Sequence, residues 1–230
     1  MRNHPNALML FAAGFGTRMR PLTNTTPKPL ISVAGRPLLD HALEQIGALR
    51  ISTRVVNTHH LADQMAVAAS ERRLSVSHET PDVLETGGGL RAAMPVLGEP
   101  EAVFTMNTDA VWTGPPALET LAEAWDPYQM DGLLLLVPPD RAVGHALKSG
   151  FTMDGFGRLR RSPTLAFTGA QILKTAPVMA ETAPAFSLNR TWDRLLPTGR
   201  LFGVIHPGFW CDVGRPEGIA EAEVMVATRV

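Results

Sequence analysis

The sequence contains a single cysteine, Cys211, among its 230 residues. One cysteine excludes an intrachain disulfide and is typical of a protein that works in a reducing compartment. No apolar run approaches the ~20 residues that are needed to cross a bilayer. Residues 1–5 also lack the apolar core of a secretory signal peptide. We therefore expect a cytoplasmic protein with no membrane partner.

The sequence has no excess of charge of either sign. Its 21 lysines and arginines nearly balance its 22 aspartates and glutamates, which leaves a formal net charge of −1. Because nucleic-acid-binding surfaces are usually strongly basic, we expect no nucleic-acid partner, and any anion must be recognised locally. The 45% hydrophobic and 19% charged residues are typical of a globular chain, which at this length can bury one α/β core.

Two familiar phosphate-binding loops are absent. The Walker A string, in which glycine is followed by four residues and then by Gly-Lys-Ser/Thr, does not occur, so ATPase chemistry of that kind is excluded. The dinucleotide fingerprint Gly-x-Gly-x-x-Gly begins at Gly14 but fails, since Met19 stands where the third glycine is required. A Rossmann dehydrogenase is therefore not expected.

The most informative segment that is present covers residues 8–30. An apolar run breaks into a turn of small residues, and backbone N–H groups in such a turn can approach an anion closely. Arg18 follows the turn, and Lys28 lies between two prolines that fix the local backbone. Two cations opposite a backbone turn predict a polyphosphate site. The alternative is an ordinary strand-to-helix turn with solvated basic residues.

Hydrophobic patterning predicts alternating strands and helices. We expect strands at residues 7–12, 52–57, 74–78, 102–107 and 132–137, and helices at 38–49, 61–71, 90–94 and 117–125. This alternation predicts an α/β fold with a mostly parallel central sheet flanked by helices. Further strands at 151–159 and 165–173 suggest a small antiparallel extension, followed by helices at 190–196 and 216–227. We find no linker and no repeat, and expect a single domain.

Two aspartates are candidate metal ligands. Asp109 follows an apolar strand that ends at Asn107, and ligands of open parallel sheets bind beyond the carboxyl ends of the strands. Asp212 lies between aromatic residues and Gly214. Mg²⁺ prefers one or two carboxylates together with phosphate oxygens and water, so Asp109 and Asp212 would suit Mg²⁺ on a triphosphate. Taken alone, either aspartate could instead cap a turn or a helix.

The order of these motifs resembles that of the sugar-1-phosphate nucleotidyltransferases. The resemblance rests on residues 14–23 (GFGTRMRPLT), 27–30 (PKPL), 85–89 (ETGGG), 107–109 (NTD) and 210–214 (WCDVG). It implies a single-domain Rossmann-like nucleotidyltransferase fold over residues 1–230. The nucleotide-binding half is expected at about 7–112 and the sugar-binding half at about 113–230. The implied substrates are a nucleoside triphosphate and a sugar 1-phosphate, and the implied cofactor is Mg²⁺.

The resemblance also implies roles for individual residues. Arg18, Lys28 and Asp109 are expected to be catalytic, and Asp109 and Asp212 to hold the metal. The expected nucleotide contacts are Ala12, Ala13, Gly14, Gly16, Thr17, Glu85, Thr86 and Gly87. The expected sugar-phosphate contacts are Asn107, Thr168, Gly169 and Arg161. For Gly87–Gly89 a flexible connection is the alternative.

Arg161 marks a departure from the family pattern. Many relatives carry a Glu-Lys-Pro string whose lysine holds the sugar phosphate, whereas this chain reads Arg160-Arg161-Ser162-Pro163. Arg160 or Arg161 could replace that lysine, and Arg161 is the candidate contact; a solvated strand-end charge is the alternative for either arginine.

Within the family, the chain is most similar to short members that transfer a uridylyl group to N-acetylmuramate 1-phosphate in cell-wall sugar recycling. Other pairs stay open: GTP with mannose 1-phosphate, dTTP with glucose 1-phosphate, or CTP with a phosphorylated alcohol. A regulatory subunit that binds nucleotide sugars without catalysis is a further alternative. The chain ends soon after residue 227, so we expect no additional acetyltransferase domain, and either a monomer or a homodimer.

Overall fold

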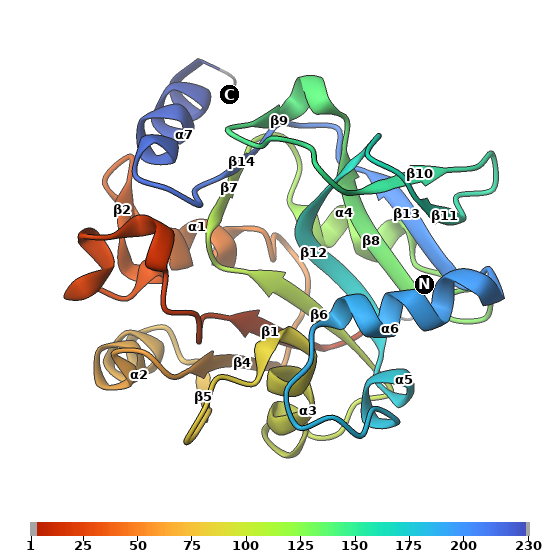
Figure 1. Ribbon diagram of the computed structural model, residues 1–230, viewed down its shortest axis with the longest axis horizontal. Coiled ribbons are helices and arrows are strands. Elements are labelled where there is room, and N and C mark those ends of the chain that lie inside the picture. The colour runs from red at the N-terminus through yellow and green to blue at the C-terminus, as the bar shows by residue number, and fades with distance from the viewer. Residues whose placement is uncertain (1–3, 229–230) are drawn as a thin grey trace.

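The computed structural model describes residues 4–228 and has a seven-stranded central sheet with helices on both faces (Figure 1). The strand order is β13-β8-β12-β6-β1-β4-β5. The strands are β1 (Ala7–Phe11), β4 (Thr53–Thr58), β5 (Ser75–His78), β6 (Ala102–Asn107), β8 (Gly132–Val137), β12 (Ala166–Lys174) and β13 (Leu201–Ile205). Every neighbouring pair is parallel except those of β12, which runs antiparallel to β6 and β8. The predicted α/β fold with a mostly parallel sheet is confirmed.

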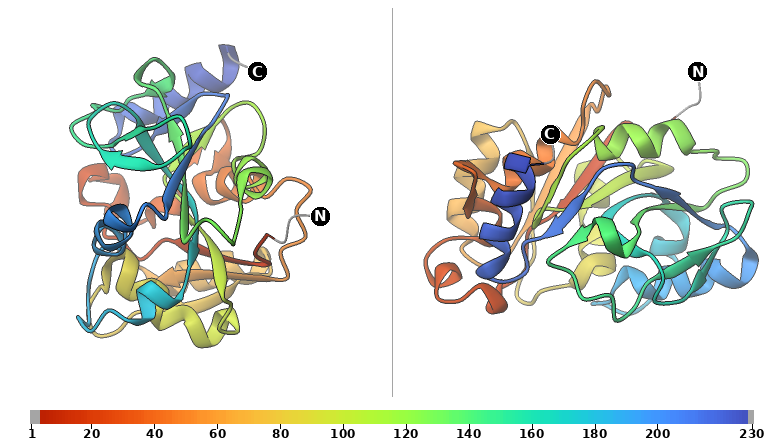
Figure 2. Two further views of the ribbon diagram at one scale, coloured as in Figure 1. Left: turned by 90° about the vertical axis from the view of Figure 1, so that its right-hand side faces the viewer. Right: turned by 90° about the horizontal axis from the view of Figure 1, so that it is seen from above.

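Helices cover both faces of the sheet (Figure 2), and a hydrophobic core lies on each face. Leu8 and Leu10 of β1 face one core, and Met9 between them faces the other, so this strand is apolar throughout. The first core includes residues of α1 (Leu38–Glu44), α2 (Ala62–Glu71) and α4 (Ala117–Ala124). The second includes residues of α3 (Glu85–Leu97), α5 (Ala176–Met179) and α6 (Leu188–Leu195). Within residues 4–228, no helix is long and apolar enough to cross a membrane.

A third, smaller core joins the start of the chain to its end. It holds α7 (Glu217–Thr228) against two small sheets, one made of β7 (Ala110–Trp112), β14 (Trp210–Asp212) and β9 (Ala142–Val143), the other of β2 (Ser32–Val33) and β3 (Arg36–Pro37). Cys211 lies in this core, and burial raises the pKa of its thiol to about 12. The pairing of β14 with β7 places the end of β14 beside the segment that leaves β6.

Four details of the predicted secondary structure were wrong. The helix expected at 38–49 ends at Glu44. Residues 151–159 do not form one strand, because the turn around Asp154 separates β10 (Phe151–Met153) from β11 (Leu159–Arg161) and makes a hairpin. The strand expected at 165–173 belongs to the central sheet. The helix expected at 90–94 begins at Glu85 and therefore contains the glycine triplet. The remaining elements are 3₁₀ helices at Thr17–Met19, Leu22–Asn24, Lys28–Leu30, Pro139–Arg141 and Leu196–Thr198.

His206 follows β13 and is completely buried. Its Nε2 donates to the carbonyl oxygen of Thr113 at 2.9 Å, and Nδ1 has no hydrogen-bond partner in the described part of the chain. A second ring proton would therefore lie in a buried place without an acceptor. Burial, together with the charge of Arg141, lowers the pKa of His206 below its ordinary value.

We expect His206 to make the fold sensitive to acid. The unfolded chain takes up this proton at about pH 6.5 and the folded chain only at lower pH. The contribution of His206 to the free energy of unfolding is therefore complete above about pH 6.5 and is lost as the pH falls below that value. His206→Gln keeps a donor without titrating, so its urea midpoint should change less than that of the wild type between about pH 7.5 and pH 5. His78→Gln, at an exposed position, is the control. Equal pH dependence in His206→Gln and wild type would contradict the prediction.

Candidate functional site

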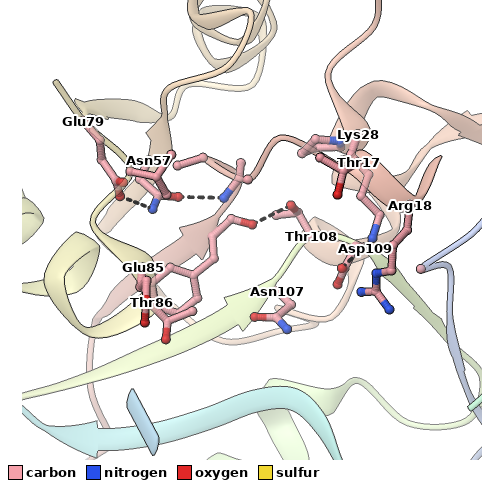
Figure 3. A pocket seen from close by; sticks show the side chains of 18 residues that line it. Thr17, Arg18, Lys28, Asn57, Glu79, Glu85, Thr86, Asn107, Thr108 and Asp109 are labelled. Atoms are coloured by element: carbon pink, nitrogen blue, oxygen red, sulfur yellow. Dashed lines mark hydrogen bonds and ion pairs between the residues drawn. The ribbon is translucent and has the colours of Figure 1, made fainter. Parts of the chain in front are cut away.

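A cavity of about 350 Å³ opens beyond the carboxyl ends of β1, β4 and β6 (Figure 3). This is the edge at which ligands of parallel sheets bind. We call it the nucleotide cavity, after the ligand that the sequence leads us to expect there. Among the residues predicted for the site, it is lined by Ala12, Ala13, Gly14, Gly16, Thr17, Arg18, Lys28, Glu85, Thr86, Asn107 and Asp109. Residues that are distant in the sequence are thus brought together around one cavity.

The loop after β1 is held in one conformation by its neighbours. Gly16 adopts a φ of +59°, and a Cβ at this position would lie 2.8 Å from Cγ2 of Thr23. The Thr23 hydroxyl donates to the Gly16 carbonyl at 2.8 Å, and the Thr108 hydroxyl donates to the Phe11 carbonyl at 2.7 Å. Glycine is therefore required at position 16 both by the backbone conformation and by the space available.

Charged side chains gather at one end of the nucleotide cavity. Lys28 Nζ contacts Asp109 Oδ2 at 2.7 Å, and Figure 3 shows Arg18 beside this pair. The Val213 backbone N–H donates to the Asp109 carbonyl at 2.9 Å, so Asp212 lies on the neighbouring strand. Burial raises the pKa of Asp212, but nearby His145, Lys28 and Arg18 outweigh this effect and leave its pKa below the ordinary value. Asp212 is therefore ionised at neutral pH.

The two carboxylates fit a hard divalent cation. Asp212 Oδ1 and Arg18 Nη1 both lie within 3.4 Å of the point that a Cβ on Gly214 would occupy, so a larger residue there would crowd both groups. No group of three or more His, Cys, Asp and Glu side chains that could hold a metal is found among the described residues. Two carboxylates suit Mg²⁺, which completes its coordination with phosphate oxygens and water. The donor set therefore fits a metal that arrives with a polyphosphate.

A chain of buried hydrogen bonds, which includes the unpredicted Glu79, supports the opposite end of the nucleotide cavity. Asn57 Oδ1 accepts from the Ala12 N–H at 2.6 Å, and Asn57 Nδ2 donates to Glu79 Oε1 at 2.6 Å. The second oxygen of Glu79 accepts from the Leu84 N–H at 2.7 Å. Both side chains line the cavity (Figure 3). The sequence feature that could have indicated Glu79 is its position: it is an acidic residue directly after the strand predicted at 74–78.

A second cavity, of about 300 Å³, adjoins the first. We call it the acceptor cavity, after the sugar phosphate that the sequence leads us to expect there. It shares Phe11, Thr86 and Asn107 with the nucleotide cavity and is otherwise lined by His145, Ser149, Gly150, Phe151, Arg161, Phe167, Gly169, Gln171, Ser187, Leu188, Asn189 and Trp192. Gly169 has a φ of +87° in the bulge of β12, and a Cβ there would lie 2.9 Å from the Asn107 side chain. This close approach fixes Asn107 at the junction of the two cavities.

Three of the predicted site residues lie outside both cavity linings. Thr168 is buried, and its hydroxyl donates to the Leu135 carbonyl at 3.0 Å. Gly87 lies against the Phe186 ring, which leaves no space for a Cβ. Asp212 lies on β14 next to the charged end of the nucleotide cavity.

Comparison with known proteins agrees with this arrangement. Residues 8–180 match the family model described as the MobA-like NTP transferase domain. N-acetylmuramate alpha-1-phosphate uridylyltransferase of Caulobacter vibrioides is 38% identical to this chain, over 99% of both sequences. The protein of the same name from Neisseria meningitidis serogroup B is 31% identical over 94% of this chain and 96% of its own length. The chain belongs to the sugar-1-phosphate nucleotidyltransferase family.

A solved structure supports the fold of this nucleotidyltransferase. The inositol-1-phosphate CTP transferase from T. maritima superimposes with a TM-score of 0.76, covering 97% of this chain and 98% of its own. The two sequences are 15% identical, so this likeness concerns the fold alone.

The chain of buried hydrogen bonds leads to a prediction about Gly89 of this nucleotidyltransferase. A Cβ on Gly89 would overlap Glu79 Oε1 and lie 2.9 Å from Asn57 Nδ2. Gly89→Ala should displace both side chains and release the Ala12 N–H. We expect the KM for the nucleoside triphosphate to rise about 10-fold, in line with the loss of one or two buried hydrogen bonds. Gly155→Ala is the matched control, because a Cβ on Gly155 meets nothing within 4 Å. An unchanged KM in Gly89→Ala would contradict the prediction.

Proposed function

We propose that this protein transfers a uridylyl group from UTP to N-acetylmuramate 1-phosphate, which yields UDP-N-acetylmuramate and pyrophosphate. The names of two relatives that match nearly the whole chain support this choice of substrates. The family membership supports the reaction class, and the residues around the nucleotide cavity support the chemistry.

The observation that carries the proposal is the junction of the two cavities. They share Phe11, Thr86 and Asn107, and Asp109, two residues beyond Asn107, lines the nucleotide cavity together with Lys28. A nucleotide in one cavity and a sugar phosphate in the other would meet at this point. Most residues of the nucleotide cavity precede residue 112, and most of the acceptor cavity follows residue 113. This division supports a nucleotide-binding half at about 7–112 and a sugar-binding half at about 113–230.

The proposed reaction is an in-line displacement at the α-phosphorus of the triphosphate. An oxygen of the sugar 1-phosphate forms the new P–O bond, and the bond to pyrophosphate breaks. No general base is needed, because a phosphate monoester with a second pKa of about 6 is mostly dianionic at neutral pH. What the protein must do is hold two anions together and neutralise the charge that moves onto the leaving group.

We assign these tasks to the residues around the nucleotide cavity. Arg18 and Lys28 neutralise phosphate charge, and Asp109 and Asp212 hold the metal. When bound there, Mg²⁺ would supply positive charge to the α-phosphate and to the leaving pyrophosphate. The other proposed nucleotide contacts are Ala12, Ala13, Gly14, Gly16, Thr17, Glu85 and Thr86, and those of the acceptor are Asn107 and Gly169. Gly87 and Thr168 are assigned supporting roles through their packing.

Nucleotidyltransferases of this kind generally use a divalent metal, and we propose that it is Mg²⁺ here because oxygen ligands and a polyphosphate suit it. The proposed location is the cytoplasm, where nucleoside triphosphates are made. A monomer or homodimer without nucleic-acid or membrane partners would be sufficient for the reaction, since the described residues of one chain line both cavities.

A substrate panel tests the proposal. Purified protein is mixed with UTP, CTP, GTP or dTTP and with the 1-phosphates of N-acetylmuramate, mannose or glucose, with and without Mg²⁺. Pyrophosphate release is measured, and the product is identified by mass spectrometry. UTP with N-acetylmuramate 1-phosphate should give the highest kcat/KM, and only with the metal. A higher kcat/KM for another pair would replace the proposed substrates. If no pair releases pyrophosphate but the protein binds a nucleotide sugar tightly, a non-catalytic subunit would be favoured.

A further inference from the structure

The acceptor cavity differs from the nucleotide cavity in the charge of the side chains that line it. Among the described residues, its lining includes two side chains that can carry positive charge, Arg161 and His145, and no aspartate or glutamate. The aromatic rings of Phe151, Phe167 and Trp192 also line it. A second anionic group on the acceptor would therefore meet a cation in this cavity and no carboxylate of the lining.

Arg161 is held in place by contacts on three sides. Its guanidinium lies over the ring of Phe151, 4.8 Å from the centroid, and over that of Trp192 at 5.6 Å. Nε and Nη2 donate to Asp193 Oδ1 at 3.1 and 2.7 Å, and Nη2 also donates to Asn189 at 2.9 Å. Within the described residues, Nη1 makes no hydrogen bond. The group is thus oriented before any ligand binds, and one nitrogen is left with its donors available.

The Trp192 ring, which forms a platform beneath Arg161, is itself fixed by buried hydrogen bonds. Trp192 Nε1 donates to Gln171 Oε1 at 2.9 Å, and Gln171 Nε2 donates to Thr105 at 3.0 Å. These bonds connect α6 to β12 and β6 of the central sheet. A cation on a rigid platform loses little side-chain entropy when it binds an anion.

The position of Arg161 separates it from the phosphate of the acceptor. That phosphate must reach the nucleotide cavity to react, and the two cavities meet at Phe11, Thr86 and Asn107. Arg161 lines the acceptor cavity but not the nucleotide cavity. Its available donors are therefore better placed for a group on the sugar ring than for the reacting phosphate.

We infer that Arg161 recognises a carboxylate substituent on the acceptor sugar and so selects sugar-acid 1-phosphates over neutral sugar 1-phosphates. The inference rests on the proposed function, because N-acetylmuramate carries a lactyl carboxylate. It moves the contact of Arg161 from the phosphate, which the sequence led us to expect, to this second anion. Guanidinium groups bind carboxylates through directed, charge-assisted hydrogen bonds.

The test compares two acceptors that differ in one charge: N-acetylmuramate 1-phosphate and its primary amide, in which the carboxylate is a carboxamide. With UTP saturating, Arg161→Gln should lower kcat/KM for the acid about 10- to 100-fold, mainly through KM, as the loss of one charge-assisted bond predicts. For the amide, kcat/KM should stay within about 3-fold of wild type, since no charged bond is lost. Arg161→Lys, which keeps the charge, should recover part of the loss.

Arg160→Gln is the matched control, because Arg160 is the exposed neighbour on the same strand and lines neither cavity. Its kinetics should equal those of wild type with both acceptors. Equal losses for acid and amide in Arg161→Gln would overturn the inference and indicate a phosphate contact or a structural role. An unchanged kcat/KM for the acid would overturn it as well. If the wild type uses neither acceptor but another sugar phosphate, the proposed function itself fails, and the inference with it.

Discussion

Replacing Lys28 by alanine is expected to lower kcat about 10²- to 10³-fold, because one preorganised electrostatic contact with a reacting group is worth about that much. Lys28 is largely buried, lines the nucleotide cavity and contacts Asp109 at 2.7 Å. The prolines on either side of it restrict the backbone. Removing its ammonium group takes away positive charge where pyrophosphate is proposed to leave. Single-turnover measurements with saturating substrates would report the loss in the chemical step itself.

Lys174→Ala is the matched control for this experiment. Lys174 also forms an ion pair with an aspartate, Asp131, at 3.0 Å, but it lies at the end of β12 and lines neither the nucleotide nor the acceptor cavity. Its loss should leave kcat within about 2-fold of wild type, as for a partly exposed ion pair. If Lys28→Ala retains wild-type turnover, the role proposed for Lys28 is wrong.

Asp212→Asn should cause a loss of similar or larger size, at least about 10²-fold in kcat/KM, through the metal. The substitution preserves the size of the side chain and removes the charge that a divalent cation would meet. Because Lys28 and Arg18 lie near Asp212, the variant leaves an excess of positive charge in a place proposed for a cation. The Mg²⁺ concentration for half-maximal activity should therefore rise, and a Mg²⁺ titration would measure it.

Asp131→Asn provides the comparison for Asp212→Asn. Asp131 is ion-paired with Lys174 and Arg200 away from both cavities. This variant should become less stable, since it weakens two ion pairs, but should keep the wild-type Mg²⁺ requirement. An identical Mg²⁺ requirement in wild type and Asp212→Asn would contradict the metal role of Asp212.

The central sheet could be predicted because its strands are encoded locally. β1, β6 and β8 are short, mostly apolar runs, and each lies within two residues of its predicted bounds. The start of α3 could not be predicted in the same way, since glycine is a poor helix former. Tertiary packing explains the glycines in this helix, because the Phe186 ring and the Glu79 carboxylate lie so close to α3 that only glycine fits at positions 87 and 89.

The two cavities differ in how far the sequence could reveal them. Residues of the nucleotide cavity follow the ends of parallel strands, and this rule brings Asn107 and Asp109 to the loop after β1. The acceptor cavity is assembled from the β10–β11 hairpin, the bulge of β12 and helix α6. Trp192 and Gln171 meet there only through the packing of α6 on the sheet. No local pattern in either segment indicates that contact.

The central claim is that Asp109 and Asp212 together hold a divalent metal on the phosphates of the nucleotide. Anomalous scattering from crystals grown with Mn²⁺ and UDP-N-acetylmuramate would test it most directly, because Mn²⁺ replaces Mg²⁺ at oxygen sites and is located by its own signal. We predict one peak bonded to a carboxylate oxygen of each aspartate and to a phosphate oxygen. Nucleotide bound in the cavity with the peak elsewhere, or with either carboxylate turned away from it, would contradict the account.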